Sequence, residues 1–496
     1  MATNNLPAIR RDRLCAVAIA ALALLATACD DDPSAPRANF VFAGCPTGNL
    51  LVNAPISLNF SSAVAASTVT PANVVVANAV TGFEIPGGLS VGNSGRSIVF
   101  TPSAPLPFGE RVSVRVQNVL DAAGQSQTGV VVCNLVTEPP PIAEVVWDRL
   151  PDASGGLLTG ATMYMPDSGF VAATQVPIYR RVGNQWQVRF NQPYFAQSSD
   201  VDFINALHGW GAHFDTRNSR GVITRSLNGG NSWDTVSTFG SLLVNRLRVD
   251  SARTGRTFGI GGGGAFSSAN FYKLDPATDR WRQTTTFSAG AGINGFSSVA
   301  DVDFAPRDTL NLAAVSRGVR INASTIIFIP GRIYRSTNAG ESWAEIPGTA
   351  ADTGRIITYL GVAQRANGDI FVTGGNGYFA RIANGSNTLQ RINLGLVSRD
   401  TLDFNALIYT DVQFAPDNDQ VGWLIGSRLS PTRQNDPRRV GVIFTTRDGG
   451  ATWIRQGVRG ANDYGAEFPG LNRLEVFSAT KAWAVGEGGV VLSLNP

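Results

Sequence analysis

Thr446-Arg-Asp-Gly-Gly-Ala-Thr-Trp453 is the stretch of sequence that decides the fold, because the chain contains close copies of it at two other places. These copies are Ser226-Leu-Asn-Gly-Gly-Asn-Ser-Trp233 and Ser336-Thr-Asn-Ala-Gly-Glu-Ser-Trp343. The three copies start at residues 226, 336 and 446, so their spacing is constant. Regular self-similarity over such a distance indicates an array of supersecondary units instead of an ordinary enzyme core.

The residue types within each copy predict a hairpin turn. The third position is Asn or Asp, which accepts backbone N–H bonds across a turn, and the fifth is Gly, which supplies a positive φ. The closing Trp is expected to pack outward from its strand. The residues concerned are Asn228, Gly230 and Trp233, then Asn338, Gly340 and Trp343, then Asp448, Gly450 and Trp453. The pattern resembles the Asp-box, or BNR, motif of sialidases, sortilin-type propellers and photosystem II assembly factor propellers. That resemblance implies a structural role for the turns.

Weaker copies of a four-strand unit predict an all-β domain at 143–496, a seven-bladed β-propeller. The start of the second strand recurs as Gly169-Phe170, Gly209-Trp210, Thr257-Phe258, Asn311-Leu312, Ile370-Phe371, Gly422-Trp423 and Ala482-Trp483. The outer-strand position recurs only six times, as Trp186, Trp233, Trp281, Trp343, Leu389 and Trp453. Because Val145-Val-Trp147 has the same pattern, we expect this amino-terminal strand to complete the last blade and close the ring.

Copies of the inner strand support the same count. Asp200-Val-Asp-Phe203, Asp301-Val-Asp-Phe304 and Asp411-Val-Gln-Phe414 share one pattern. Asn245-Arg-Leu-Arg-Val249 and Asn472-Arg-Leu-Glu-Val476 share another.

Residues 40–137 predict a separate β-sandwich. Short alternating runs such as Ile56–Phe60, Ser97–Phe100 and Arg111–Val116 are separated by turn residues. The order of motifs, including Val99-Phe-Thr-Pro-Ser-Ala-Pro-Leu-Pro-Phe-Gly109 and Val119-Leu-Asp-Ala-Ala-Gly124, resembles the bacterial Ig-like domain of the S-layer (SbsA) type. Such modules usually act as spacers or stalks. Residues 138–142, with Pro139-Pro-Pro141, form a stiff linker to the propeller.

Cysteine use fits an oxidising compartment. Cys45 and Cys133 lie near the two ends of the Ig-like segment, where a disulfide would join its first strand to its last. Two free cysteines are the alternative.

The amino terminus is typical of a lipoprotein signal peptide over residues 1–28. Three arginines precede the uncharged apolar run Leu14–Ala28, which is too short for a membrane-spanning helix. Leu25-Ala-Thr-Ala-Cys29 resembles the bacterial lipobox, which implies lipidation of Cys29 and anchoring in the cell envelope, in the periplasm or at the cell surface. Residues 29–39 then form a polar tether. A soluble secreted protein cleaved near Ala28 is the alternative.

Charge and short motifs argue against several function classes. Of 40 basic and 37 acidic residues, three basic residues and one acidic residue lie in 1–28, so the remaining chain is near neutral and shows no basic patch of the kind that binds nucleic acid.

His208 and His213 are five residues apart on extended segments, which predicts that they lie on opposite faces and share no metal ion. Gly259-Ile-Gly-Gly-Gly-Gly264 lacks the following helix of a dinucleotide site, so we expect an inter-strand loop and no cofactor.

The sequence predicts a binding protein instead of an enzyme. Sialidases place their first arginine in a Phe/Tyr-Arg-Ile-Pro motif, which is absent here. The units from Gly422 to Trp453 and the ending Ala482–Gly489 resemble the photosystem II assembly factor family, without implying photosynthesis. We therefore expect a non-catalytic, monomeric envelope protein that binds a protein or glycan. A glycoside hydrolase with two carboxylates across the central cleft, and a structural or adhesion protein, are the alternatives.

The predicted binding face consists of loops between second and third strands. These loops are expected to be long near Asp215–Gly221, Arg317–Arg332 and Ser427–Val440, and to emerge opposite the repeat turns. They carry arginines suited to carboxylates or phosphates, or simply solvated arginines of an Arg-rich protein. The residues are Arg217, Arg220, Arg317, Arg320, Arg332, Arg428, Arg433, Arg438 and Arg439.

Overall fold

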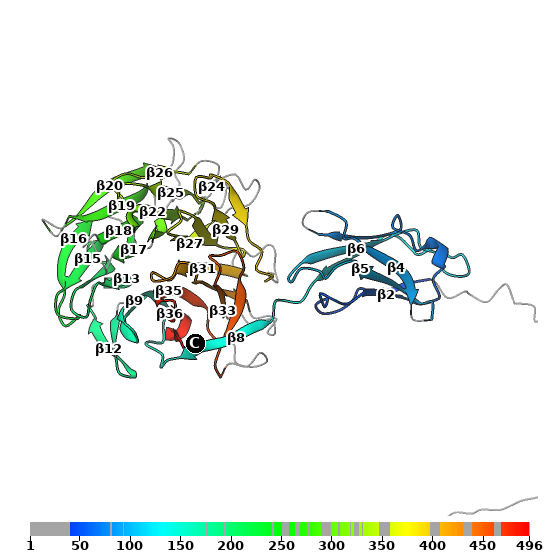
Figure 1. The fold of residues 1–496 in the computed structure, drawn as a ribbon, viewed down its shortest axis with the longest axis horizontal. Coiled ribbons are helices and arrows are strands. Elements are labelled where there is room, and N and C mark those ends of the chain that lie inside the picture. Colours follow the sequence, from blue (N-terminus) through cyan, green and yellow to red (C-terminus); the bar gives the residue numbers. More distant parts are fainter. Residues whose placement is uncertain are drawn as a thin grey trace, which may run out of the picture.

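The computed structural model shows two β-rich parts joined by a short connection (Figure 1). It describes residues 40–495 apart from 80–81, 93, 175–176, 193–194, 241–242, 250–256, 263–267, 276–277, 279, 289–298, 306–307, 318, 322–326, 330, 347–357, 397–406, 430–438 and 461–467. The predicted signal peptide 1–28, the lipidation site Cys29 and the tether 29–39 lie outside these residues. Within the described ranges no helix is long and apolar enough to cross a membrane.

The amino-terminal part is a two-sheet sandwich. One sheet has the order β1 (Phe42–Gly44), β2 (Ile56–Phe60), β5 (Ser97–Pro102), β4 (Gly87–Gly92), and the other β3 (Val74–Asn78), β6 (Arg111–Val116), β7 (Val131–Val136). Burial alternates along β2 and β6, because successive side chains point to opposite faces of a strand. A disulfide joins Cys45 to Cys133, with the Cα atoms 5.5 Å apart, and so links the two sheets.

The carboxyl-terminal part is a propeller of four-stranded antiparallel units arranged in a ring (Figure 1). Blade 1 has β9 (Leu158–Met165), β10 (Ser168–Ala173), β11 (Ile178–Val182) and β12 (Gln185–Phe190). Blade 2 has β13 (Phe195–Phe203), β14 (Gly209–Asp215), β15 (Arg220–Ser226) and β16 (Asp234–Phe239). Blade 3 has β17 (Leu243–Val249), β18 (Thr257–Gly262), β19 (Ser268–Asp275) and β20 (Arg280–Ser288).

The remaining units continue the ring. Blade 4 has β21 (Val299–Ala305), β22 (Asp308–Ser316), β25 (Ile333–Ser336) and β26 (Ala344–Glu345), with the hairpin β23 (Val319–Ile321) and β24 (Ile327–Ile329) inserted. Blade 5 has β27 (Tyr359–Gln364), β28 (Ile370–Gly374), β29 (Phe379–Ile382) and β30 (Leu389–Arg391). Blade 6 has β31 (Leu407–Phe414), β32 (Gly422–Leu429), β33 (Arg439–Thr446) and β34 (Ile454–Val458).

The last unit, blade 7, is completed by a strand from the start of the domain. Strand β8 (Ile142–Arg149) pairs antiparallel with β37 (Val491–Leu494), next to β36 (Lys481–Gly486) and β35 (Leu471–Ser478). The predicted closing segment Val145–Trp147 lies within β8. The same strand also pairs in parallel with β34 of blade 6, so the two blades form one eight-stranded sheet. Trp147 is completely buried there.

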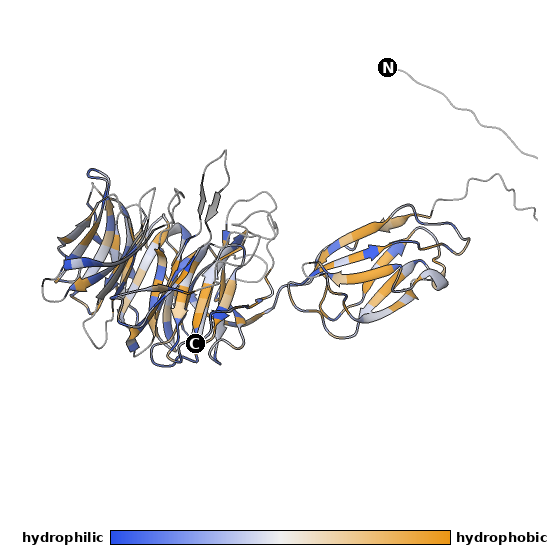
Figure 2. Ribbon diagram, turned by 90° about the horizontal axis from the view of Figure 1, so that it is seen from above, coloured by the Kyte–Doolittle hydropathy of each residue, from blue (hydrophilic) through white to orange (hydrophobic). Residues whose placement is uncertain are grey.

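The blades pack through apolar faces and present their inner strands to a common axis. Strands β9, β13, β17, β21, β27, β31 and β35 follow one another around this axis, and neighbouring members are in contact. In the side view, apolar residues concentrate along the strands, and the propeller lies beside the sandwich (Figure 2). The axis therefore forms a channel lined by one residue in two from each inner strand.

Three local predictions are wrong in detail. The loop near Asp215–Gly221 is a four-residue turn, because β14 and β15 extend to Asp215 and Arg220. Arg428 and Arg439 likewise lie within β32 and β33 instead of a loop. Residues 259–262, predicted as part of a loop, belong to β18. In each case the strand pairing within the blade extends further than turn-type composition suggests.

Candidate functional site

The repeat turns have the predicted hydrogen bonds. The backbone N–H of Ser232 donates to Asn228 Oδ1 over 2.9 Å, and that of Thr452 donates to Asp448 Oδ1 over 2.9 Å. The same bond joins Ser342 to Asn338. The fifth-position glycines have φ values of 81°, 75° and 90° at Gly230, Gly340 and Gly450.

The closing tryptophans pack between blades, not outward. Trp233 donates its indole N–H to Gly230 and Arg189 carbonyls, and its ring meets Phe190 and Phe203 edge-on. Trp343 stacks on Phe271 of the preceding blade, and Trp453 contacts Phe371 and Phe379 of the preceding blade. The indole fills the wedge between two twisted sheets, which strand alternation alone does not reveal.

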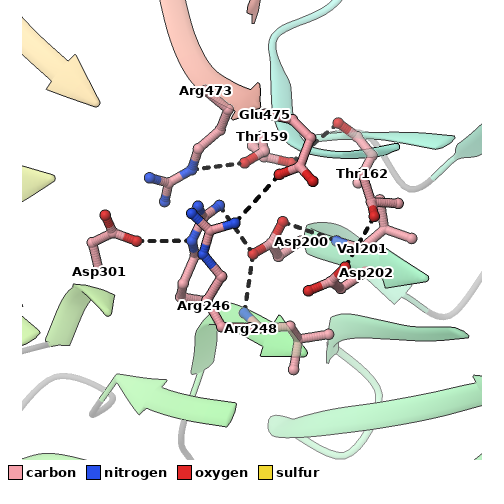
Figure 3. A network of polar contacts seen from close by, with 12 residues as sticks. Thr159, Thr162, Asp200, Val201, Asp202, Arg246, Arg248, Asp301, Arg473 and Glu475 are labelled. Atoms are coloured by element: carbon pink, nitrogen blue, oxygen red, sulfur yellow. Dashed lines mark hydrogen bonds and ion pairs between the residues drawn. The ribbon is translucent and has the colours of Figure 1, made fainter. Parts of the chain in front are cut away.

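The channel holds a layer of buried charges centred on Arg246 (Figure 3). Arg246 Nη1 lies 3.2 Å from Asp200 Oδ2, and its Nε lies 2.8 Å from Asp301 Oδ1. Its Nη2 lies 4.0 Å from Asp411 Oδ2. Burial acts to lower the pKa of Arg246, but these three carboxylates and that of Glu475 outweigh it and raise the pKa. We call this set the upper layer.

The carboxylates of the upper layer also join successive blades. Asp200 accepts the backbone N–H of Leu247, Asp301 that of Val362, and Asp411 that of Leu474, each over 3.0 Å. Blades 2, 4 and 6 are thereby bonded to blades 3, 5 and 7. These hydrogen bonds satisfy backbone groups that would otherwise be orphaned in the interior.

A second set of charges lies two residues further along the inner strands. Arg248 Nη1 lies 3.3 Å from Glu475 Oε2 and its Nη2 lies 3.8 Å from Asp303 Oδ1. Asp202 accepts hydrogen bonds from Thr162 Oγ1 and from the backbone N–H of Val249. Desolvation raises the pKa of Asp303 to about 7 and also raises the pKa values of Asp202 and Glu475, against the charge of Arg248.

This second set forms the floor of a pocket of about 130 Å³. Phe203, Phe304 and Phe414 are among the apolar residues that line it. The pocket opens at the carboxyl ends of the inner strands. The repeat turns lie on the same side: in blade 2, the backbone N–H of Gly229 in the repeat turn donates to the carbonyl of Leu207, which follows the inner strand β13. We call it the acidic pocket, and the side on which it opens the repeat-turn face.

The other end of the channel carries arginines. Arg473 on β35 donates its Nε–H to the Thr159 carbonyl over 3.1 Å. Arg317, directly after β22, keeps part of its surface in solvent. Desolvation and the charge of Arg473 both lower the pKa of Arg317. The connection from β22 to β25 lies on this side of the propeller. We call this side the arginine face.

The nine predicted arginines are only partly brought together. Arg217 is exposed in the turn after β14, and Arg220 contacts Asp215 at 3.3 Å. Arg332 is bound to Glu345 at 2.6 Å, and Arg439 donates to Ser427 Oγ. Arg428 is half-buried, Arg320 lies in β23, and Arg433 and Arg438 lie outside the described residues.

Arg473 and the charged inner-strand residues were not predicted as a site. The sequence signal was present in the Asp-x-Asp patterns at Asp200 and Asp301, the Asp-x-Gln pattern at Asp411 and the Arg-x-Arg pattern at Arg246. When every second residue of several inner strands is charged, the charged side chains share one face and line the central channel.

The histidines are structural. His213 is fully buried between Ser198 Oγ and Thr224 Oγ1, and burial lowers its pKa to about 3. His208 packs against Trp210. Within the described residues, no three His, Cys, Asp or Glu side chains are grouped so that they could hold a metal ion.

Comparisons with solved structures give matches at low identity. YCF48 bound to D1 peptide has a TM-score of 0.47 at 12% identity, covering 72% of this chain and 100% of that chain. YCF48 from Cyanidioschyzon merolae has a TM-score of 0.42 at 14% identity, covering 71% and 99%. The GH74 enzyme of Niastella koreensis has a TM-score of 0.47 at 15% identity, covering 70% of this chain and 53% of that chain. These values assign neither a partner nor a reaction to this chain.

A search of curated proteins found no match. Among family models, the one described as the bacterial Ig-like domain matches residues 32–133, which contain most of the amino-terminal sandwich.

Proposed function

We propose that this protein is a non-catalytic lipoprotein of the cell envelope whose propeller binds an anionic segment of a protein or glycan partner. The binding surface is the arginine face. The Ig-like domain then acts as a spacer between the lipid on Cys29 and the propeller.

The observation that carries the proposal is the exposed Arg317 at the end of the channel, with the buried Arg473 close enough for the two charges to interact. Desolvation lowers the pKa of Arg317 first, and the neighbouring Arg473 charge lowers it further. Burial and the charge of Arg246 lower the pKa of Arg473 more than the nearby aspartates raise it. Two guanidinium groups under mutual repulsion are stabilised by a carboxylate, phosphate or sulfate that accepts hydrogen bonds from both.

A structural role for the upper-layer carboxylates favours binding over catalysis. Asp200, Asp301 and Asp411 each use an oxygen to hold a backbone N–H of the next blade, and each contacts Arg246. A carboxylate engaged in this way is a poor proton donor or nucleophile, which a glycoside hydrolase requires as a pair.

The test is capture of envelope proteins and glycans by the full chain and by Arg317→Glu. Charge reversal converts attraction for an anionic partner into repulsion, so we expect at least a tenfold loss of capture at low salt. Arg115→Glu, an exposed reversal on β6 of the Ig-like domain, is the matched control and should capture normally. Equal capture by both variants and by wild type would refute the arginine face, and hydrolysis of an oligosaccharide by the chain would favour the glycoside hydrolase.

The anchor is tested separately. Metabolic labelling with an alkyne fatty acid should tag the wild-type protein and leave Cys29→Ala untagged. Equal labelling of both proteins would remove the lipoprotein part of the proposal and leave the propeller's binding role untouched.

A further inference from the structure

The acidic pocket lies at the opposite end of the channel from Arg317, so it is a site distinct from the arginine face. Its floor contains three carboxyl groups, on Asp202, Asp303 and Glu475, and one guanidinium, on Arg248. Side chains of Asp303, Glu475 and Arg248 are 13–15% exposed, so these groups are mostly withdrawn from water. If all are ionised, the floor carries an excess of negative charge.

The other neighbouring cations are engaged mainly by groups outside the pocket, although the charge of Arg246 also lowers the pKa of Glu475. Arg246 in the upper layer is engaged by Asp200, Asp301 and Asp411, which are themselves three carboxylates around one guanidinium. Arg473 is directed to the Thr159 carbonyl. Arg365 stacks on Phe414 at 5.4 Å from the ring centre, and is paired with Asp369 and Asp419.

A separate observation identifies a missing hydrogen-bond donor. Gln364 lines the same pocket and is only 3% exposed, yet its side-chain Oε1 accepts no hydrogen bond from any described residue. Its backbone N–H is already bonded to Asp303 Oδ2. A buried carbonyl oxygen without a donor is costly, and a bound N–H group would satisfy it.

The shape and lining select the kind of cation. Phe203, Phe304 and Phe414 line the pocket above the carboxyl groups, so an apolar stem would contact rings while a charged tip reached the floor. The volume of about 130 Å³ is below that of ordinary small-molecule sites, which favours one side chain. No three carboxylates here are grouped as metal ligands within the described residues.

We propose that the acidic pocket binds the ammonium group of a lysine side chain presented by a partner protein. The three N–H donors of an ammonium match the Oε1 of Gln364 and the carboxylate oxygens of Asp303 and Glu475. The methylene stem lies against the phenylalanine rings. This site is independent of the proposed arginine face, so either can fail without the other.

Proton linkage supports the assignment. Desolvation raises the pKa of Asp303 to about 7 and raises the pKa values of Asp202 and Glu475, so protons occupy these groups at mildly acidic pH. Binding of an ammonium favours their charged forms. Affinity for lysine should therefore increase as the pH rises from 6 to 8, while the ammonium itself stays charged. The facing charges are Arg248, the upper layer of Arg246, Asp200, Asp301 and Asp411, and beside it the buried Arg473.

The experiment measures binding of the peptide acetyl-Gly-Lys-Gly-amide to the full chain by ligand-observed NMR at pH 8. We expect saturable binding that is lost when the lysine is Nε-acetylated and that weakens at least tenfold in Glu475→Gln and in Gln364→Met. Asp234→Asn, which removes an exposed carboxylate on β16, should bind as wild type. Melting temperatures of all variants verify folding, and Gln364→Met provides the answer if Glu475→Gln does not fold.

Three results would overturn the proposal. They are absence of saturable binding by the lysine peptide, equal binding of the acetylated peptide, and undiminished binding in folded Gln364→Met. Tighter binding of the corresponding arginine peptide would also reject the ammonium specificity.

Discussion

Two positions on each inner strand determine the chemistry of the channel. Where blade 2 has Asp200, blade 1 has Gly160, and a Cβ built on Gly160 would lie 2.3 Å from Asp200 Oδ1. The Asp200 carboxylate thus occupies the space that a side chain at position 160 of blade 1 would need. A Gly160→Ala substitution would displace this carboxylate from Arg246, so glycine here reflects close approach and not a special backbone angle.

Asp448 provides a prediction at the scale of a single residue. Desolvation acts to raise its pKa, but hydrogen bonds from Thr452 and Thr446 outweigh this and lower the pKa to about 2. Its stabilising contribution is therefore present above pH 4 and lost as the pH falls through about 2. We expect Asp448→Ala to cost about 1 kcal/mol at neutral pH, since it removes the turn's hydrogen bonds.

The matched variant is Asp448→Asn, because Asn228 and Asn338 hold the equivalent turns. It should lose little stability at pH 7. Urea unfolding of the full chain at pH 7 and pH 3 measures both effects. A loss of stability at pH 7 as large in the Asn variant as in the Ala variant would show that the charge, not the acceptor oxygen, stabilises the turn.

At the scale of elements, β8 closes the ring and connects two blades. Its residues pair with β37 on one side and with β34 on the other, and Trp147 donates its indole N–H to Gln456 Oε1. The strand thus covers two sheet edges that would otherwise expose unpaired backbone groups. One short segment therefore contributes to the stability of blades 6 and 7 together.

Deleting residues 142–150 should destabilise the whole propeller, because it reopens both edges and empties the space filled by Trp147. The measurement compares thermal unfolding of the full chain with that of the same chain lacking residues 142–150. Arg149→Ala, which removes an exposed ion pair with Asp152 at the end of the same strand, should unfold nearly as wild type. Unchanged propeller melting in the deletion would show that the ring closes without β8.

At the scale of the whole molecule, the sandwich and the propeller are stabilised in different ways. The sandwich relies on one apolar core of its own and on a disulfide whose cysteines are 88 residues apart. The propeller relies on apolar contacts between blades and on the buried charges of its channel. The two ends of the channel also differ in charge, with the exposed Arg317 at one end and the carboxyl groups of the acidic pocket at the other.

The disulfide is expected to stabilise the sandwich and not the propeller. Replacing Cys45 and Cys133 by serine and alanine should lower the stability of the sandwich by about 4 kcal/mol, because the reduced unfolded chain regains the entropy of a long loop. The propeller transition should stay where it is in differential scanning calorimetry. A shift of both transitions together would show that the two parts unfold as one cooperative unit.

Much of the fold was predictable from the sequence because its signals are local. The turn chemistry at Asn228, Asn338 and Asp448 acts within five residues, and alternation along Ile56–Phe60 or Arg111–Val116 marks a buried strand face directly. Even the closing strand at Val145–Trp147 was identifiable, because a repeat with one missing copy points to its replacement.

The candidate sites were decided by the tertiary structure alone. Alternation along a strand shows that Asp200, Arg246, Asp301 and Asp411 share an orientation, but not that a ring brings them within contact distance. Likewise, the unpaired Oε1 of Gln364 and the repulsion between Arg317 and Arg473 arise only from neighbours on other blades. Charge interactions depend on distance and desolvation in space, and the sequence determines neither until the ring closes.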